Sequence, residues 1–134
     1  MMTWPEDHEL QDPATIPRMA EESREQARLV AALRRHWNLR PDSHRPIIFA
    51  VPNGGKRNAA EAANLKTQGV LAGIHDLIIW CPGGKSILVE MKAHDGKVSD
   101  SQIKIQNHAK ALGFTSIVAH SAEEALAELR KTHE

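Results

Sequence analysis

Apolar residues in the first third of the chain follow the spacing of a helix. Between Met19 and Trp37 they recur at Leu29, Val30, Leu33 and Trp37, with intervals of one, three and four residues. Such spacing places these side chains on one face of an amphipathic helix. We therefore expect a long first helix that packs this face against a core.

Further along the chain, four short runs rich in β-branched and aromatic residues predict strands. The runs cover residues 47–51, 73–80, 86–92 and 115–120. Between and after them, capping signals predict three more helices, which follow Asn58, Ser99 and Ser121. The expected order is helix, strand, helix, strand, strand, helix, strand, helix.

The connections between the strands predict how they pair. A tight turn at 82–84 joins the second and third strands, which favours an antiparallel hairpin. A helix joins the third and fourth strands, which favours a parallel pair with a right-handed crossover. The predicted fold class is α/β, with a mixed four-stranded sheet flanked by helices.

Length and composition limit the number of domains and the cellular context. The chain has 134 residues, 41% of them hydrophobic, which is enough for one compact domain and too short for two. We expect a single domain over residues 18–134, preceded by an irregular acidic arm at residues 1–17 with three prolines. No apolar run approaches the roughly 20 residues that span a bilayer. We therefore expect a cytoplasmic protein without membrane association or organic cofactor.

Charge is balanced in total but unevenly distributed. The chain carries 17 basic and 17 acidic residues. Residues 1–25 contain seven acids and two bases, whereas residues 26–110 contain thirteen bases and six acids. This segregation is compatible with a basic face that approaches phosphate groups, although charge runs are commonly no more than solvated surface.

Two charged residues lie on one face of the third predicted strand. Side chains alternate along a strand, so Glu90 and Lys92 share a face with Leu88. Asp76 precedes the buried run of the neighbouring strand. Because isolated buried charges are costly, we expect these three groups to meet each other, a cation, or both. Two converging carboxylates suit Mg²⁺ or Mn²⁺; a simple cross-strand ion pair is the alternative interpretation.

Two helical residues add to this cluster. Glu22 lies on the buried stripe of the first helix, where an acid is unexpected unless it reaches a site; Glu21 and Glu25 are near enough to be alternatives. Gln102 is the first residue on the buried stripe of the helix that follows the third strand. This position should place it close to Glu90 on that strand. The same residue could complete a capping box with Ser99, and the two roles do not exclude each other.

The spacing of these residues resembles a known signature. Asp76 followed by Glu90-Met91-Lys92 is similar to the D…ExK motif of the PD-(D/E)XK nuclease superfamily. The wider sequence resembles the virus-type replication-repair nuclease (VRR-NUC) domain over roughly residues 20–130. The matching segments are Glu22 and Gln26, VPNGGKR at 51–57, LKTQGVLAGIHDL at 65–77, VEMK at 89–92 and the run from Ser99 to Gln102.

One residue departs from the family pattern. His75 stands where the family commonly has proline, directly before Asp76. This change is compatible with an altered bend into the strand or with a contact between His75 and a phosphate. A lone histidine is more often structural, so a structural role is the favoured interpretation.

The resemblance implies a restriction-endonuclease-like core that hydrolyses phosphodiester bonds with one or two divalent ions. The metal ligands that it implies are the side chains of Asp76, Glu90 and Glu22 and the backbone carbonyl of Met91. It further implies that Lys92 orients the attacking water and stabilises developing negative charge. Gln102 would hold Lys92 or the water in place.

Candidate DNA-binding residues follow from a glycine turn and from exposed cations. A turn of this kind presents backbone N–H groups, and two cations follow it, which suits a phosphate backbone; an ordinary solvated loop is the alternative. The residues that we expect to contact DNA are Asn53, Lys56, Arg57, Lys97 and Lys104. No pattern supplies a code for bases, so recognition of DNA shape is expected.

Together these features predict a metal-dependent, structure-selective DNA endonuclease that resolves branched DNA such as Holliday junctions. A homodimer would let so small a domain cut paired strands. A phage or prophage origin fits an isolated domain of this type. The alternatives are a nicking, flap or restriction-like nuclease, or a DNA-binding module that does not cleave.

Overall fold

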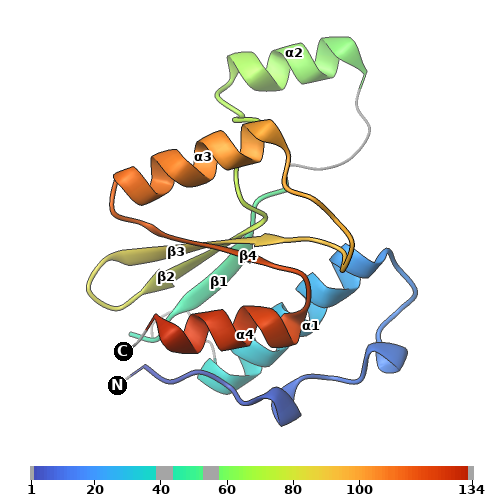
Figure 1. Ribbon diagram of the computed structural model, residues 1–134, viewed down its shortest axis with the longest axis vertical. Coiled ribbons are helices and arrows are strands. Elements are labelled where there is room, and N and C mark those ends of the chain that lie inside the picture. The colour runs from blue at the N-terminus through green and yellow to red at the C-terminus, as the bar shows by residue number, and fades with distance from the viewer. Residues whose placement is uncertain (1, 39–43, 53–57, 133–134) are drawn as a thin grey trace.

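The computed structural model describes residues 2–38, 44–52 and 58–132. A single four-stranded sheet with the order β1-β2-β3-β4 lies at its centre (Figure 1). The strands are β1 (Ile47–Ala50), β2 (Leu77–Cys81), β3 (Lys85–Met91) and β4 (Thr115–Ala119). The α-helices are α1 (Glu21–Trp37), α2 (Ala59–Thr67), α3 (Asp100–Ala111) and α4 (Ala122–Lys131). The mixed α/β architecture with helices around the sheet is confirmed.

The strand pairing agrees with the predicted topology. β2 and β3 form an antiparallel hairpin in which Leu77 lies opposite Val89. β3 and β4 are parallel, with Glu90 beside Val118, and α3 forms the connection between them. β1 adds to the free side of β2 in antiparallel register. The sheet is therefore mixed, and β3, which carries Glu90, is an inner strand.

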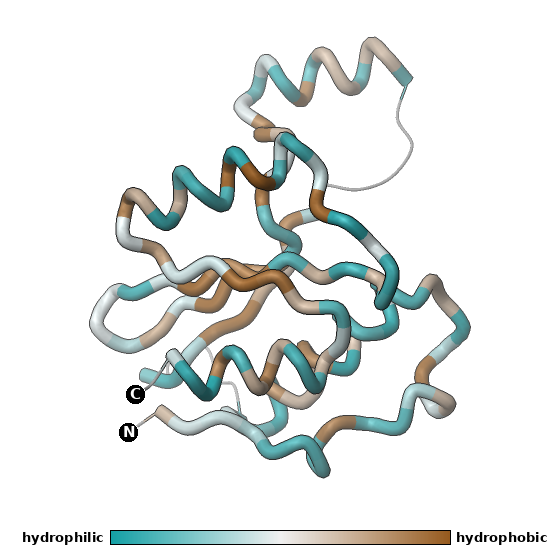
Figure 2. Tube along the Cα trace, viewed as in Figure 1, coloured by the Kyte–Doolittle hydropathy of each residue, from teal (hydrophilic) through white to brown (hydrophobic). Residues whose placement is uncertain are grey.

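Helices cover the two faces of the sheet unequally. α1 and α4 pack together against one face, and α3 lies over the other (Figure 1). The first face supplies the main core, in which apolar strand residues meet the stripes of α1 and α4. That core includes Leu29, Leu33, Ile48, Leu77, Ile79, Val89, Met91, Ile117, Leu126 and Leu129. The chain is brown, and so hydrophobic, along these central strands (Figure 2).

The N-terminal segment packs on the domain. It contains two short 3₁₀ helices, η1 (Asp7–Glu9) and η2 (Pro13–Thr15), and is otherwise irregular, as expected. Trp4 is only 8% exposed and meets Trp37 edge to face, with ring centroids 5.5 Å apart. The Arg130 guanidinium donates to the Asp7 carboxylate at 2.7 Å. A buried tryptophan and an ion pair therefore hold this segment against the domain.

α2 is the least embedded of the helices. It begins after Asn58, whose side chain accepts a hydrogen bond from the Glu61 N–H, as the capping signal predicted. No residue of α2 is buried. α2 extends away from the sheet and from the other helices (Figure 1).

Two sequence predictions require correction. β2 starts at Leu77 and not at residue 73, because Gly73 has a positive φ of 86° and the residues after it make side-chain contacts in place of ladder bonds. The sequence spacing also predicts a buried stripe on α3 through Ile105, Ala109 and Leu112. The buried positions are instead Gln106 and Ala109, and Leu112 is 67% exposed. α3 ends at Ala111, so Leu112 lies beyond the part of the helix that faces the sheet.

Candidate active site

Asp76 and Glu90 close the end of the β2–β3 hairpin with their side chains. The Asp76 N–H donates to Glu90 Oε2 at 3.1 Å. In return, the Met91 N–H donates to Asp76 Oδ2 at 2.9 Å. Each carboxylate thus holds a backbone N–H of the opposite strand, and the two acids are brought together just beyond the last ladder pair.

Glu90 is an acid in an unfavourable place for a negative charge. Its side chain is 2% exposed. Burial, together with a side-chain hydrogen bond and the negative charge of Asp76, raises the pKa of Glu90 to about 8, although the Lys92 ammonium acts in the opposite direction. When both acids are ionised, the single charge of Lys92 compensates only part of the negative charge of the pair. A cation bound between or beside the two carboxylates would relieve the repulsion between their negative charges.

Lys92 and Gln102 both approach the Glu90 carboxylate. Lys92 Nζ lies 3.9 Å from Glu90 Oε1, with its side chain mostly buried. The Gln102 amide donates to the same Glu90 oxygen, and its own carbonyl oxygen accepts from the Ser99 N–H at 2.9 Å. Gln102 therefore makes both contacts considered from the sequence: it completes the capping box of α3 and reaches the acidic strand.

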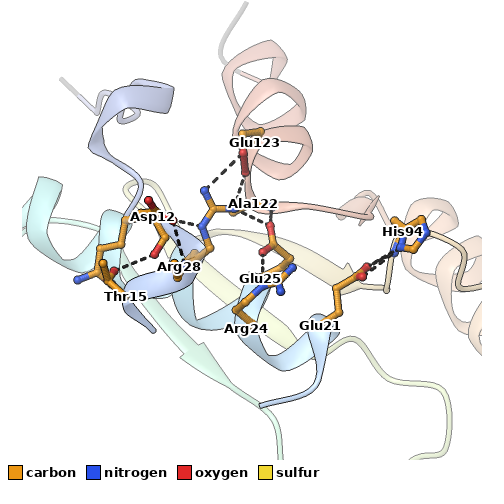
Figure 3. Close-up of polar contacts among 11 residues, drawn as sticks. Asp12, Thr15, Glu21, Arg24, Glu25, Arg28, His94, Ala122 and Glu123 are labelled. Atoms are coloured by element: carbon orange, nitrogen blue, oxygen red, sulfur yellow. Dashed lines mark hydrogen bonds and ion pairs between the residues drawn. The ribbon is translucent and has the colours of Figure 1, made fainter. Parts of the chain in front are cut away.

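Two of the three acids of α1, Glu21 and Glu25, have different partners (Figure 3). Glu21 accepts from the N–H and ring of His94, in the loop after β3. Glu25 is buried and accepts from Arg28 at 2.7 Å and from the Ala122 N–H at 3.1 Å. These contacts join α1 to neighbouring elements and do not face the Asp76 carboxylate.

Glu22 is the α1 acid that shares the surroundings of the site. It is half-buried. Burial raises the pKa of Glu22, the charge of Asp76 raises it further, and Lys92 lowers it. These influences place the carboxylate of Glu22 within electrostatic reach of both residues. Of the three candidates on α1, Glu22 is the one whose pKa responds to both Asp76 and Lys92, and its role at the site stays a prediction.

His75 lies inside the protein, beneath α3. Its side chain is 1% exposed, and Nε2 lies 2.6 Å from Ser116 Oγ on β4. Burial is the largest influence on the pKa of His75 and lowers it, so the ring is neutral near pH 7. The structure agrees with the favoured interpretation of a structural histidine and not with a phosphate contact, because the ring has almost no exposed surface.

The donor set suits a hard divalent ion with water in its coordination sphere. Within the described residues, no three His, Cys, Asp or Glu side chains are grouped closely enough to hold a metal ion. Mg²⁺ nevertheless keeps several waters and is commonly held by one or two carboxylates. Asp76 and Glu90 supply that pair, and burial and the neighbouring Asp76 keep the pKa of Glu90 raised although the Lys92 ammonium lies beside it. The residues present therefore fit such an ion.

The candidate DNA-binding residues are only partly described. Asn53, Lys56 and Arg57 lie outside the described residues. Lys97 and Lys104 are exposed, on the loop before α3 and on α3 itself. Their surface positions allow contact with DNA.

A cavity of about 1210 Å³ lies at the other end of the sheet. Trp37, Cys81, Ile87 and Phe114 are among its lining residues. It adjoins the start of β3, whereas Glu90 lies near the end of that strand. The cavity is therefore separate from the acidic cluster.

In the part of the chain that the structure describes, no helix is long and apolar enough to cross a membrane.

Comparisons with known proteins point to one family. The model of the VRR-NUC domain matches residues 20–123 of the chain. A solved structure named "VRR_NUC domain protein" is similar to it with a TM-score of 0.65 and 22% sequence identity, covering 85% of this chain and 88% of that one. No curated protein matches the chain. The solved structure supports the fold, a PD-(D/E)XK-like core, and the matched range contains the whole acidic cluster.

Proposed function

The chain belongs to the VRR-NUC family of nuclease-type domains, and on that basis we propose that it is a metal-dependent DNA endonuclease. The observation that carries the proposal is the Asp76–Glu90 pair, in which two carboxylates meet a lysine and a glutamine at the end of a hairpin. The reaction would be hydrolysis of a phosphodiester bond.

Asp76, Glu90 and the Met91 carbonyl would hold Mg²⁺ or Mn²⁺, with Glu22 contributing through water. Such an ion, when bound, polarises the scissile phosphate and lowers the pKa of water that attacks it. Glu22 joins through water in this assignment because it is coupled to Asp76 by charge, while no third acid is grouped with the pair among the described side chains.

Lys92 and Gln102 would act on the reacting groups and on their orientation. The ammonium of Lys92 lies beside Glu90, where it can hold a water and stabilise negative charge that develops on the phosphate. Gln102 is anchored at one end by the Ser99 N–H and holds Glu90 with the other. This anchoring restricts the Glu90 carboxylate to one orientation, which favours a preorganised site.

We further propose that the substrate is branched DNA, such as a Holliday junction, and that the enzyme acts as a homodimer. Two copies related by a twofold axis would present two active sites to the paired strands of a junction. Exposed Lys97 and Lys104, with Asn53, Lys56 and Arg57, would contact the phosphate backbone. A nicking, flap or restriction-like nuclease is the second candidate, because the described residues supply no contact specific to a junction.

The test is incubation of the protein with labelled four-way junction, flap and linear duplex, in Mg²⁺, in Mn²⁺ and in chelator. We expect cleavage of branched DNA that requires the ion. Asp76→Asn and Lys92→Ala should each lower the rate by more than about 100-fold, beyond the loss typical of residues that only support metal ligands.

Glu128→Gln and Lys131→Ala are matched controls, because these residues form an exposed ion pair on α4. Both variants should cut at the parent rate. If no DNA is cut with any divalent ion and Asp76→Asn binds DNA as tightly as the parent, the chain is a binding module and the nuclease proposal fails. Cutting of linear duplex at one fixed sequence would instead support the restriction-like candidate.

A further inference from the structure

The four residues that lead into β2 are held from several sides. A Cβ on Gly73 would lie 2.6 Å from the Ser101 carbonyl oxygen, so the backbone there lies directly against the first turn of α3. The Asp76 carbonyl accepts from the Val51 N–H at 2.8 Å, next to β1. His75 reaches Ser116 on β4. The segment is therefore fixed by α3, β1 and β4 before β2 begins.

The contact of His75 with Ser116 crosses the width of a strand. His75 precedes β2, Ser116 belongs to β4, and β3 lies between those two strands. Ser116 lies beside Leu88 in the β3–β4 register, one side-chain position before Glu90 on the same face. The imidazole thus lies across β3, the strand that carries Glu90. Its hydrogen bond connects the segment before Asp76 to β4, on the other side of β3.

On the side that faces β3, Asp76 depends on side-chain contacts because it lies outside the β2–β3 ladder. The β2–β3 register begins with Leu77 opposite Val89, and the N–H of Asp76 donates to a side chain and not to a backbone carbonyl. Rotation of the peptide between His75 and Asp76 would move both the N–H that Glu90 accepts and the carboxylate that Met91 approaches. Restricting His75 restricts both groups.

We propose that His75 is a positioning residue, which fixes Asp76 against Glu90 and Met91 through its hydrogen bond to Ser116. This effect of His75 on the position of Asp76 is a property of the folded protein. Its consequence for catalysis rests on the proposed nuclease function, in which Asp76 is a metal ligand. Within the described residues, His75 Nδ1 has no hydrogen-bond partner, so Ser116 is the polar contact that orients the ring.

The direct test is amide hydrogen exchange, read by NMR, in the parent and in His75→Ala. The reporters are the N–H groups of Asp76 and Met91, which donate to the two carboxylates. Both should exchange about tenfold faster in the variant, because native-state exchange reports how readily the local structure opens. Amides in α4 should keep the parent rates.

Two further variants separate positioning from general stability. Ser116→Ala should reproduce the local loss, and adding it to His75→Ala should cause no further loss. His75→Gln, whose side-chain nitrogen can still reach Ser116, should restore protection, and it keeps the test decisive if His75→Ala does not fold. The proposal is overturned if exchange becomes faster by one common factor throughout the molecule. It is also overturned if exchange at the Asp76 and Met91 amides does not become faster.

His36→Ala is the matched control, because His36 Nε2 also meets a hydroxyl, Thr3 Oγ1, at 2.8 Å. It should leave the Asp76 and Met91 amides unchanged. Calorimetric titration with Mn²⁺ alone then tests the catalytic consequence: we expect binding about 10–100-fold weaker in His75→Ala. A parent that binds no Mn²⁺ and cuts no DNA contradicts the proposed function, whereas hydrogen exchange still decides the positioning role.

Discussion

Glu21, Glu22 and Glu25 stand in the first two turns of α1 but meet three different environments. Glu21 pairs with His94, and Glu25 is buried with Arg28. Glu22 is the one whose pKa is raised, first by burial and then by the charge of Asp76. A single helix turn thus separates an acid that stabilises the fold from one whose charge the fold disfavours.

At Glu22 we predict opposite effects on activity and stability. Glu22→Gln should lower metal-dependent cleavage about 10–100-fold, as expected for loss of a group that acts on a metal through water. The same change should leave the melting temperature equal or higher, because it removes a negative charge near Asp76. Cleavage rates and thermal unfolding of the same preparation measure both.

Glu21→Gln is the matched control, since its partner His94 is exposed and belongs to a surface loop. It should cut DNA within about twofold of the parent, because exposed ion pairs contribute little. A large loss for Glu21→Gln with none for Glu22→Gln would reverse the assignment of the α1 acid.

Local spacing was sufficient to predict the capping-box contact of Gln102 and its approach to β3, whereas Glu22 as the site acid stays a prediction. The stripe through Leu29 and Leu33 fixes which side of α1 faces the sheet, and Glu22 lies at its start. The partners of Glu25 could not be predicted in this way. Ala122, whose N–H donates to Glu25, is 97 positions away in the chain, so only the packed α1 and α4 bring them together.

Between elements, a buried ion cluster joins α1, α4 and the N-terminal segment (Figure 3). Arg28 donates to Glu25 and Glu123 at 2.7 Å and to the Gln11 carbonyl at 2.8 Å. Arg28 and Glu25 are almost fully buried, whereas Glu123 is half exposed. The cluster therefore holds α1 in the register that directs Glu22 to the site.

We predict that Glu25→Gln costs about 3 kcal/mol of unfolding free energy at neutral pH, because it leaves the Arg28 charge poorly compensated in a buried position. Burial alone would raise the pKa of Glu25, but hydrogen bonds from Ala122, Arg24 and Arg28 outweigh it and lower the pKa below 4.5. Since the folded pKa lies below the unfolded one, the ionised carboxylate stabilises the fold above about pH 4.5, and this contribution fades in acid.

Urea unfolding at neutral and acidic pH measures this difference. The gap between parent and Glu25→Gln should be full at pH 7 and shrink as the pH falls through the folded pKa. Glu128→Gln, which breaks an exposed pair with Lys131, should change stability little at either pH. A gap that is the same at both pH values would show that the carboxylate charge is not what stabilises this cluster.

The element boundaries that the sequence missed have a common cause. Hydrophobic spacing predicts which residues suit a strand, but Gly73 lies against α3 and His75 reaches β4, while the Asp76 carbonyl still bonds to the residue after β1. The α3 stripe failed for a similar reason, because Gln106 and not Leu112 faces the sheet. Where polar side chains take buried positions, apolar periodicity no longer identifies the inner face.

For the whole molecule, the incomplete cover of one sheet face matters most. α3 packs over the β4 side, while the apolar side chains of β1 and β2 on that face stay partly open. Phe49 and Ile78 are half-buried, and Trp80 is 56% exposed, with its ring 4.9 Å from that of Phe49. Aromatic side chains stabilise interfaces strongly when they are buried. This strip of Phe49, Ile78 and Trp80 is where we expect the second copy of the proposed homodimer.

We predict that the parent sediments as a dimer in analytical ultracentrifugation and that Trp80→Glu sediments as a monomer. A charge on the strip would have to be desolvated in the interface, which is costly without a partner. Leu112→Glu is the control, because Leu112 is equally open at 67% exposure but lies past the end of α3; it should remain a dimer. If Trp80→Glu is still a dimer, the interface lies elsewhere, and if the parent is a monomer, the proposed homodimer is wrong.

Cleavage of junction DNA by the monomeric variant gives a second result. If it still nicks the junction but no longer cuts both strands together, the active site is complete in one copy and dimerisation serves only to coordinate the two cuts.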